Sequence, residues 1–313
     1  MVHNIKHIVI AGAGVMGSSM AQLFADYGYK VTLYDVKEEA LDKSLNLIRI
    51  NQEASMTDGG LTQKESDRIM AAISFTCDRD CFKTADFVIE AIIENMNIKH
   101  RFWTEVSELV PVTTVLTSNT SGLSITEIAK AVKCPERFCG MHWLNPPHIC
   151  PVIEVIKGGK TAQETVDVVY DVAVDIHRRP VRLKKEVPGF LINRFQFAIL
   201  REAMSLVEAG VADQEDIDDV FKYGLGLRYA CLGPFEIADL GGLDTFEKIA
   251  SYLFADLSNT DQVHAMLTDI VKEGNYGVKS CKGFYDYSNG RDAQVIAKRD
   301  QDFRKISKCL YEK

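Results

Sequence analysis

The chain has 313 residues, of which 46% are hydrophobic and 26% are charged, enough for two globular domains with buried cores. Its net charge of −8 argues against a nucleic-acid partner, and no apolar run reaches the length of a membrane span. The first residues lack a signal-peptide pattern, so the protein is expected to be cytoplasmic and its eight scattered cysteines to be reduced thiols. These cysteines complete no zinc pattern, so no metal site is expected.

The chain opens with a glycine-rich turn between a predicted strand (5–10) and a helical pattern (14–27). Gly12 permits the tight turn, Gly14 lets the backbone approach a pyrophosphate, and Gly17 lets helix and strand pack closely. A turn of this kind places phosphates at a helix N-terminus, where free N–H groups and the helix dipole favour negative charge. The residues expected to contact a dinucleotide here are Gly12, Gly14, Val15, Met16 and Gly17.

A second predicted strand, residues 30–35, ends in Asp35. A carboxylate at this position accepts hydrogen bonds from both ribose hydroxyls of NAD and repels the 2′-phosphate of NADP. The predicted cofactor is therefore NAD, and Lys37 is the one nearby cation that keeps NADP as an alternative.

Strands and helices continue to alternate up to about residue 183. Further strands are predicted over 73–76, 86–91, 113–117, 137–142, 152–156 and 180–183. Helices are predicted over 38–53, 96–109, 124–133 and 162–176, with capping boxes at Thr62–Glu65 and Thr161–Glu164. This order predicts a Rossmann-type, doubly wound, mostly parallel sheet with right-handed crossovers. The long helical stretch 38–73 is expected to form a helix pair, or arm, that projects from the sheet.

The pattern changes after the polar segment 184–189. A long apolar helix is predicted from Phe190 to Gly210, which suits a core or dimer helix. Further helices are predicted over 213–223, 235–254 and 260–273, with loops at 223–226 and 241–242. The fold class is therefore α/β, with an NAD-binding domain over 1–186 and an all-α domain over 187–313.

Polar residues follow several predicted strand ends, which form the ligand crevice of an open parallel sheet. His142 and Glu154 offer an acid/base pair, because a histidine with an ordinary pKa near ~6.5 can take a hydroxyl proton while a carboxylate fixes its tautomer. Ser121 and Asn193 offer hydrogen-bond donors for a substrate oxygen. These residue types fit hydride transfer between a nicotinamide and an alcohol carbon.

Other interpretations of these residues stay open. His148 and His177 are rival bases, and Glu94 with Lys99 forms either a solvated pair at a helix start or part of the site. Three residues also have structural alternatives. Glu154 is open to a role as a strand carboxylate, Ser121 as a helix cap and Asn193 as a brace of the hinge.

Taken together, the motifs resemble the 3-hydroxyacyl-CoA dehydrogenase family, especially the short bacterial 3-hydroxybutyryl-CoA dehydrogenases. The resemblance covers nearly the whole chain and rests on residues 12–17, 88–99, 118–121, 140–146, 152–155, 188–194, 233–239 and 283–287. It implies oxidation of (S)-3-hydroxy substrates in a cleft between the domains and a homodimer formed through the helical domain. It also implies that His142 is the catalytic histidine and that Glu154 is its carboxylate partner. Ser121 and Asn193 would contact the substrate oxygen, and the residues near the nicotinamide ribose would be Glu94, Lys99 and Asn119.

Two departures bear on the substrate. Relatives that bind coenzyme A often carry several lysines on the arm, whereas residues 44–53 offer only Arg49 as a cation. Residues 193–199 and 224–230 resemble a branch that acts on free 3-hydroxy acids and includes gulonate 3-dehydrogenase, lambda-crystallin and carnitine dehydrogenase. In that branch Arg228 would bind a substrate carboxylate through two parallel hydrogen bonds.

Three functional hypotheses follow. The first is a short-chain 3-hydroxyacyl-CoA dehydrogenase, and the second is an NAD-dependent dehydrogenase of a free 3-hydroxy acid. The third is a structural protein that binds NAD without turnover, as the crystallin relative illustrates. In the first two, Trp143 and His148 stand in a segment that differs from the usual family sequence and are expected to reshape the substrate pocket.

Overall fold

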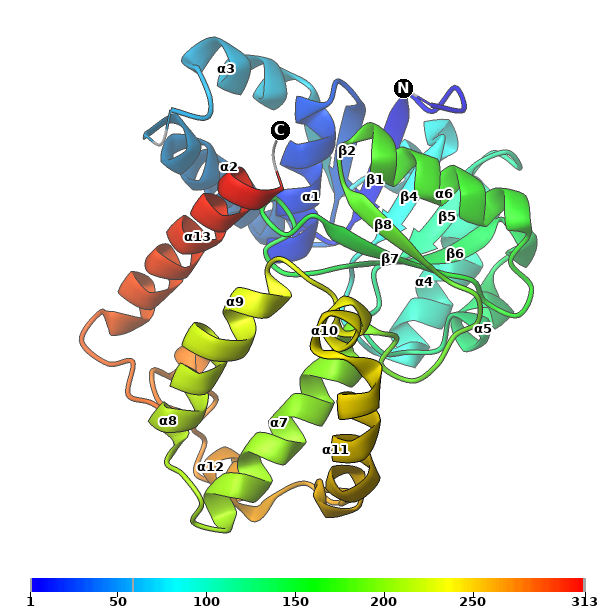
Figure 1. Ribbon diagram of the computed structural model, residues 1–313. Coiled ribbons are helices and arrows are strands. Elements are labelled where there is room, and N and C mark those ends of the chain that lie inside the picture. Colours follow the sequence, from blue (N-terminus) through cyan, green and yellow to red (C-terminus); the bar gives the residue numbers. More distant parts are fainter. Residues whose placement is uncertain (1, 58, 312–313) are drawn as a thin grey trace. The chain divides into compact units, whose positions relative to one another are not determined.

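The computed structural model describes residues 2–57 and 59–311, and the chain divides into two compact units, Met1–Asn193 and Arg194–Lys313 (Figure 1). The expected boundary between residues 186 and 187 lies a few residues earlier. The difference arises because the backbone N–H groups of Leu191 and Ile192 bond to Glu154, which ties this segment to the first unit. Over the described ranges no helix is both long and apolar enough to cross a membrane.

The first unit is built on an eight-stranded sheet in the order β3-β2-β1-β4-β5-β6-β7-β8. The strands are β1 (His7–Ala11), β2 (Lys30–Tyr34), β3 (Ile73–Thr76), β4 (Phe87–Glu90), β5 (Val115–Ser118), β6 (Phe138–Trp143), β7 (Val152–Ile156) and β8 (Arg179–Leu183). All eight predicted strands occur within two residues of their expected bounds.

Neighbouring strands are parallel except β6 and β7, so the predicted mostly parallel sheet is confirmed. The exception follows from chain length. Residues 144–151 join β6 to β7, and this segment is shorter than the dozen or so residues (~12) that a parallel crossover needs.

Helices cover both faces of the sheet (Figure 1). They are α1 (Val15–Asp26), α2 (Glu38–Thr57), α3 (Gln63–Ala71), α4 (Met96–Leu109), α5 (Ile125–Ile128) and α6 (Gln163–Asp175), with 3-10 turns at Arg79–Thr84, Ala129–Ala131 and Pro135–Arg137. Alternation along β1 sends Ile8 and Ile10 into a core with α1 and α6, and Val9 into a core with α4 and α5. The predicted helix over 124–133 is shorter, because α5 passes into a 3-10 turn.

The predicted helix pair within residues 38–73 is present as α2 and α3. Both helices contact α1, and Leu41, Ile48 and Ile69 belong to the core on that side of the sheet. The pair is therefore anchored on α1 and does not project freely.

The two predicted capping boxes had different outcomes. The box at Thr62 is confirmed, because its hydroxyl accepts the N–H of Glu65 while the Glu65 carboxylate accepts the N–H of Thr62. The box at Thr161 is wrong. Ala162 is the N-cap of α6, and the Thr161 hydroxyl instead donates to the carbonyl oxygen of Phe138 at 2.6 Å.

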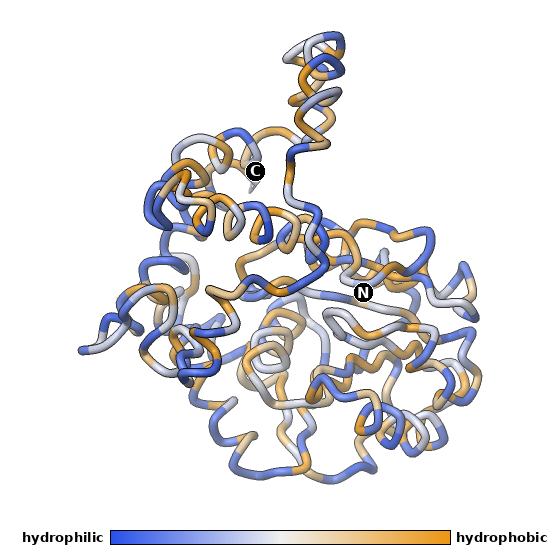
Figure 2. Tube along the Cα trace, turned by 90° about the horizontal axis from the view of Figure 1, so that it is seen from below, coloured by the Kyte–Doolittle hydropathy of each residue, from blue (hydrophilic) through white to orange (hydrophobic). Residues whose placement is uncertain are grey.

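The second unit is helical, as predicted, and α7 enters it from the last residues of the first unit. Its helices are α7 (Ile192–Glu208), α8 (Gln214–Asp219), α9 (Gly226–Tyr229), α10 (Pro234–Gly241), α11 (Leu243–Asp256), α12 (Ala265–Lys272) and α13 (Arg291–Leu310). Hydrophobic and hydrophilic segments alternate along the helices of the protein (Figure 2). The helix α13 was not predicted, because it is rich in charged residues and has few apolar ones to set a period.

The two predicted glycine breaks also differ. At 241–242 the break is confirmed, since Gly242 has a φ of 89° between α10 and α11. At 223–226 the predicted loop is wrong, because a π-helix, Val220–Leu225, continues from α8 into α9. A Cβ at Gly226 would lie 2.6 Å from the carbonyl oxygen of Phe221, so the wider turn ends on a residue that must be glycine.

Candidate active site

The glycine turn after β1 is packed too tightly for side chains at two of its three glycines. Gly12 has a φ of 108°, and a Cβ there would lie 2.4 Å from the carbonyl oxygen of Ala91. A Cβ at Gly17 would lie 1.9 Å from the carbonyl oxygen of Gly12. Gly14, in contrast, has no atom within 4 Å of its Cβ position, so the backbone is open there to a ligand. The first N–H groups of α1 follow this open residue, which is the arrangement that binds a pyrophosphate.

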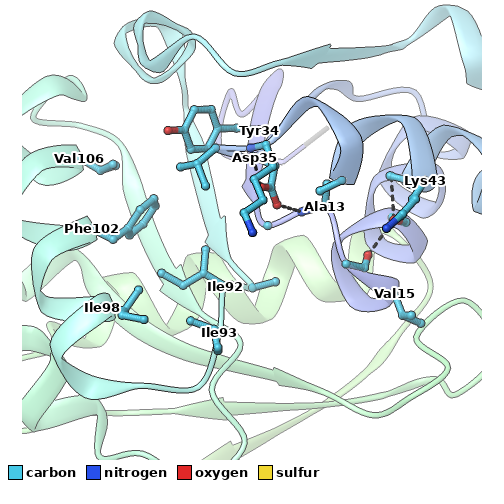
Figure 3. A pocket seen from close by; sticks show the side chains of 18 of the residues that line it. Ala13, Val15, Tyr34, Asp35, Lys43, Ile92, Ile93, Ile98, Phe102 and Val106 are labelled. Atoms are coloured by element: carbon cyan, nitrogen blue, oxygen red, sulfur yellow. Dashed lines mark hydrogen bonds between the residues drawn. The ribbon is translucent and has the colours of Figure 1, made fainter. Parts of the chain in front are cut away.

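Asp35 follows β2 and is held by backbone groups on two sides. Its Oδ2 accepts the N–H of Ala13 at 2.8 Å, and its Oδ1 accepts the N–H of Lys37 at 3.0 Å. The carboxylate thus lies beside the glycine turn, at the rim of a cavity of about 890 Å³ (Figure 3). Apolar side chains line the cavity opposite, among them Ile92, Ile98, Phe102 and Val106. These residues fit NAD, because the turn can accept a pyrophosphate, Asp35 can accept hydrogen bonds from the adenosine ribose and the apolar wall can contact a base.

A buried ion pair lies where β4 and β5 end. Lys99 is 1% exposed and Glu90 is 0% exposed, and the ammonium group of Lys99 contacts Oε1 of Glu90. Oε2 of Glu90 accepts the hydroxyl of Ser118 at 2.7 Å, and Oε1 accepts the N–H of Ile92 at 3.0 Å. Glu90 was not among the predicted site residues. An acid within the otherwise apolar strand β4 was the signal that could have identified it.

Glu94 joins this pair to the loop after β5. Its Oε2 lies 3.2 Å from Nζ of Lys99, and its Oε1 accepts the Thr120 hydroxyl at 2.6 Å and the Ser121 N–H at 2.9 Å. Burial raises the pKa of Glu94, but the hydrogen bond from Thr120 and the charge of Lys99 outweigh it, so the pKa lies below its ordinary value. Glu94 is therefore an anion that holds Ser121 in place.

His142 and Glu154 face one another across the antiparallel strands β6 and β7. Nδ1 of His142 lies 2.7 Å from Oε2 of Glu154, and the two residues are 5% and 0% exposed. A carboxylate only accepts hydrogen bonds, so Nδ1 carries a proton and Nε2 of the neutral ring has a free lone pair. The ring of Phe190 lies 5.6 Å from the imidazole.

Two asparagines link these groups to the loop after β5. Nδ2 of Asn193 donates to the carbonyl oxygen of Ser121 at 2.7 Å, and Oδ1 of Asn119 accepts the N–H of Trp143 at 2.9 Å. The structure thus brings Ser121 together with Asn193 and Glu94, and it ties Asn119 to the residue after His142. All of these residues belong to the first unit.

Other predicted residues lie elsewhere. The expectation that Trp143 shapes the substrate pocket is wrong, since its side chain is 2% exposed and packs edge-on against Phe24 in the core. His177 lies in the turn before β8 and packs on Tyr27, which follows α1. His148 is half-buried in the connection between β6 and β7. It lies close to His142 in the sequence and so stays an alternative to it as the base.

The two predicted substrate cations are both exposed. Arg49 belongs to α2, and Arg228 belongs to α9 of the second unit. Their roles remain predictions. Within residues 2–57 and 59–311, no group of three His, Cys, Asp or Glu side chains is arranged to hold a metal ion.

The Rossmann sheet, the glycine turn and Asp35 define the NAD-binding domain of an NAD-dependent dehydrogenase, followed by a helical domain. The chain belongs to the 3-hydroxyacyl-CoA dehydrogenase family, because residues 7–187 match its NAD-binding domain and residues 189–287 match its C-terminal domain.

Individual relatives differ in their substrates. The chain is 38% identical over 307 residues to a 5-formyl-3-hydroxy-2-methylpyridine 4-carboxylate 5-dehydrogenase of Mesorhizobium japonicum, covering 98% of both chains. A solved structure of an enzyme of this name, described as an NAD⁺-dependent dismutase, aligns with a TM-score of 0.91 at 36% identity over 98% of both chains. An (S)-3-hydroxybutyryl-CoA dehydrogenase from Ralstonia eutropha aligns with a TM-score of 0.76 at 30% identity, over 91% of this chain and 100% of its own.

Proposed function

We propose that this protein is an NAD-dependent dehydrogenase of a small substrate with a free carboxylate, and that His142 and Glu154 are its acid/base pair. The observation that carries the substrate class is the charge of the helix α2. It bears the carboxylates Glu38, Glu39, Asp42 and Glu53 against the cations Lys43 and Arg49. The 3′-phosphate of coenzyme A is bound best by several cations, so this arm favours a substrate without coenzyme A.

The comparisons support the same substrate class. The structure of the pyridine-carboxylate relative aligns with a TM-score of 0.91 at 36% identity, whereas that of the 3-hydroxybutyryl-CoA dehydrogenase from Ralstonia eutropha aligns with 0.76 at 30%. A substrate acid that carries either a hydroxyl or an aldehyde group is therefore the class to test first.

NAD supplies the acceptor for the hydride. Nε2 of His142 takes the proton of the substrate hydroxyl as the hydride leaves the same carbon, so an alcohol becomes a carbonyl group. Glu154 stabilises the imidazolium that forms, through the hydrogen bond at Nδ1. An aldehyde enters the same step as its hydrate, which has a hydroxyl on the carbon that loses the hydride, and gives a carboxylic acid.

Ser121 and Asn193 hold the substrate oxygen. The Ser121 hydroxyl lies 3.3 Å from Oε1 of Glu94, and the bond from Asn193 to Ser121 uses one of two amide hydrogens. The other amide hydrogen can donate to an oxygen that becomes negative in the reverse reaction, and so can the Ser121 hydroxyl once it turns from the Glu94 carboxylate, to which it donates here. Glu94 and Asn119 then act mainly by keeping this loop in place.

A second candidate is a short-chain (S)-3-hydroxyacyl-CoA dehydrogenase. The two family matches favour it, because together they cover residues 7–187 and 189–287. The same acid/base pair would serve it, and the difference would lie in how the rest of the substrate is held.

The experiment that separates the candidates is a comparison of substrates, followed through NADH absorbance, which falls when NADH reduces an oxo group and rises when NAD oxidises the hydrate of an aldehyde. Acetoacetyl-CoA is set beside free acetoacetate, 3-oxo sugar acids and an aromatic aldehyde acid. Turnover with a free acid and not with acetoacetyl-CoA is the expected result. Rapid turnover with acetoacetyl-CoA alone would establish the second candidate, and NADH binding without any turnover would point to a structural protein.

We also infer that the protein is a homodimer through its helical unit. Among the described residues after 193, Met204 is the one buried side chain. Large apolar side chains stay open, such as Phe197 at 62%, Tyr223 at 77% and Phe254 at 75% exposure. Exposure on this scale is typical of surfaces that a partner covers, and sedimentation of the purified protein tests it.

A further inference from the structure

At the end of the cavity that would hold the adenine base of NAD, the wall is apolar and the rim carries a charged side chain. The adenine of NAD is joined to the ribose that Asp35 serves, so it must enter the part of the cavity next to this residue. Ile98, Phe102 and Val106 of α4 turn their side chains toward that space, opposite Tyr34 and Asp35 (Figure 3). These side chains provide an apolar wall for one face of a flat base, but they leave open what covers its other face.

Arg79 stands at the rim of the same cavity. It begins the 3-10 turn between β3 and β4, and its Nε donates to the hydroxyl of Tyr34 at 3.3 Å. Its terminal nitrogen forms an ion pair with Glu105 of α4, and about half of its side chain, 53%, is exposed. The guanidinium group therefore spans the opening from the turn to the helix.

These two contacts leave the flat faces of the guanidinium group unused. Both the Tyr34 hydroxyl and the Glu105 carboxylate bind in the plane of the group, at its N–H edges. A guanidinium that is held by its edges has a fixed plane, and such a plane stacks on aromatic rings. The pair with Glu105 also offsets much of its charge, so stacking and not charge attraction is the main interaction that it can offer.

We propose that Arg79 is an adenine-contacting residue, whose guanidinium plane covers the base of NAD at the rim of the cavity. Glu105 and the Tyr34 hydroxyl are the positioning groups that hold this plane. The adenine then lies between the guanidinium group and the apolar side chains of α4. Nothing in this inference depends on the substrate, so it stands or falls independently of the proposed function.

The test measures dissociation constants of NADH and AMP by calorimetry for the wild type and four variants. Arg79→Ala is expected to weaken both ligands about tenfold, and Arg79→Lys by a similar factor, because an ammonium group keeps the charge but has no flat face. Glu105→Gln keeps the guanidinium group and is expected to lose no more than about threefold. Lys83→Ala removes a cation from the same 3-10 turn and is expected to stay within about twofold of the wild type.

Three results would overturn the proposal. Arg79→Ala with both constants within twofold of the wild type would mean that the residue does not contact the base. Arg79→Lys with wild-type affinity would reduce its role to charge. Equal losses in Glu105→Gln and Arg79→Ala would show that the ion pair shapes the cavity and that the guanidinium plane adds nothing. Circular dichroism and thermal melting establish that each variant is folded.

Discussion

Glu154 binds His142 with one carboxylate oxygen and the start of α7 with the other. Oε2 accepts from Nδ1 of His142 at 2.7 Å, and Oε1 accepts the N–H groups of Leu191 at 2.7 Å and of Ile192 at 3.1 Å. The carboxylate lies at a helix N-terminus, where the helix dipole favours its negative charge. One buried side chain thus orients the histidine and fixes the segment that leads into the helical unit.

This double role gives the first prediction, for Glu154→Gln. The amide oxygen of glutamine can still accept the two backbone N–H groups, which leaves its NH₂ group facing Nδ1 of His142. Nδ1 must then accept, so the proton of the neutral ring moves to Nε2, which can no longer act as a base. We expect kcat to fall by at least ~10²-fold with a small change in Tm.

His142→Gln should produce a loss of kcat of similar size, and His148→Gln serves as the control. His148 lies in the connection between β6 and β7, outside the strand pair that holds the acid/base pair. We expect its variant to keep kcat within a few-fold of the wild type. A larger loss for His148→Gln than for His142→Gln would reverse the assignment of the base.

The glycine turn gives a matched pair of variants with opposite outcomes. In Gly17→Ala the new methyl group would lie 1.9 Å from the carbonyl oxygen of Gly12, which the backbone cannot avoid. We expect a loss of at least ~3 kcal/mol in the free energy of unfolding, or no folded protein. In Gly14→Ala no atom lies within 4 Å of the methyl group, so the Tm should stay unchanged.

The Gly14 variant should nevertheless weaken NADH binding about tenfold or more, because the methyl group would stand where the pyrophosphate approaches the backbone. Urea unfolding and NADH titration of both variants check the pair. Wild-type affinity for NADH in Gly14→Ala would mean that the pyrophosphate does not come close to this residue.

The acid/base pair also shows what the sequence alone could and could not predict. Apolar runs predict the strands, and the polar residues that follow these runs mark the strand ends. His142 and Glu154 could therefore be paired by residue type. Their direct opposition depends on β7 running antiparallel to β6, which the short connection 144–151 implies but which local patterns do not reveal.

Tertiary contacts are harder to predict than elements. Trp143 follows His142 in the strand, and its side chain therefore points to the opposite face, into the core beside Phe24. The π-helix that replaces the expected loop at 223–226 depends on one close approach between Gly226 and a carbonyl group five residues earlier. The glycines within 223–226 predict a turn in this segment. Sequence patterns alone do not distinguish a glycine that a loop requires from one that a close backbone contact requires.

The buried pair of Lys99 and Glu90 gives a prediction about stability. Lys99→Met removes the cation next to a carboxylate that is 0% exposed, and an unpaired buried charge costs about 3–5 kcal/mol. The double variant Glu90→Gln with Lys99→Met removes both charges and should recover most of this loss in urea unfolding. If Lys99→Met unfolds like the wild type but binds NADH poorly, Lys99 serves the cofactor and not the fold.

His7 gives a prediction about pH. Its Nδ1 donates to the carbonyl oxygen of Thr84 at 2.9 Å, and its Nε2 accepts the Thr32 hydroxyl at 2.8 Å, so the ring is held in its neutral form. Burial is the main reason why the pKa of His7 lies below the ordinary value of a histidine, and the charge of Lys30 acts in the same direction. Below the ordinary pKa of about 6.5, the unfolded chain therefore binds a proton that the folded chain does not.

The contribution of His7 to stability is thus present above pH ~6.5 and is lost as the pH falls toward the lower pKa of the folded state. Urea unfolding at a series of pH values should show a free energy of unfolding that falls with acidity in the wild type. His7→Asn keeps an N–H donor for Thr84 but cannot gain the proton, so its stability should fall less steeply between pH ~7 and ~5. Parallel curves for the two proteins would show that His7 does not contribute to the acid sensitivity of the fold.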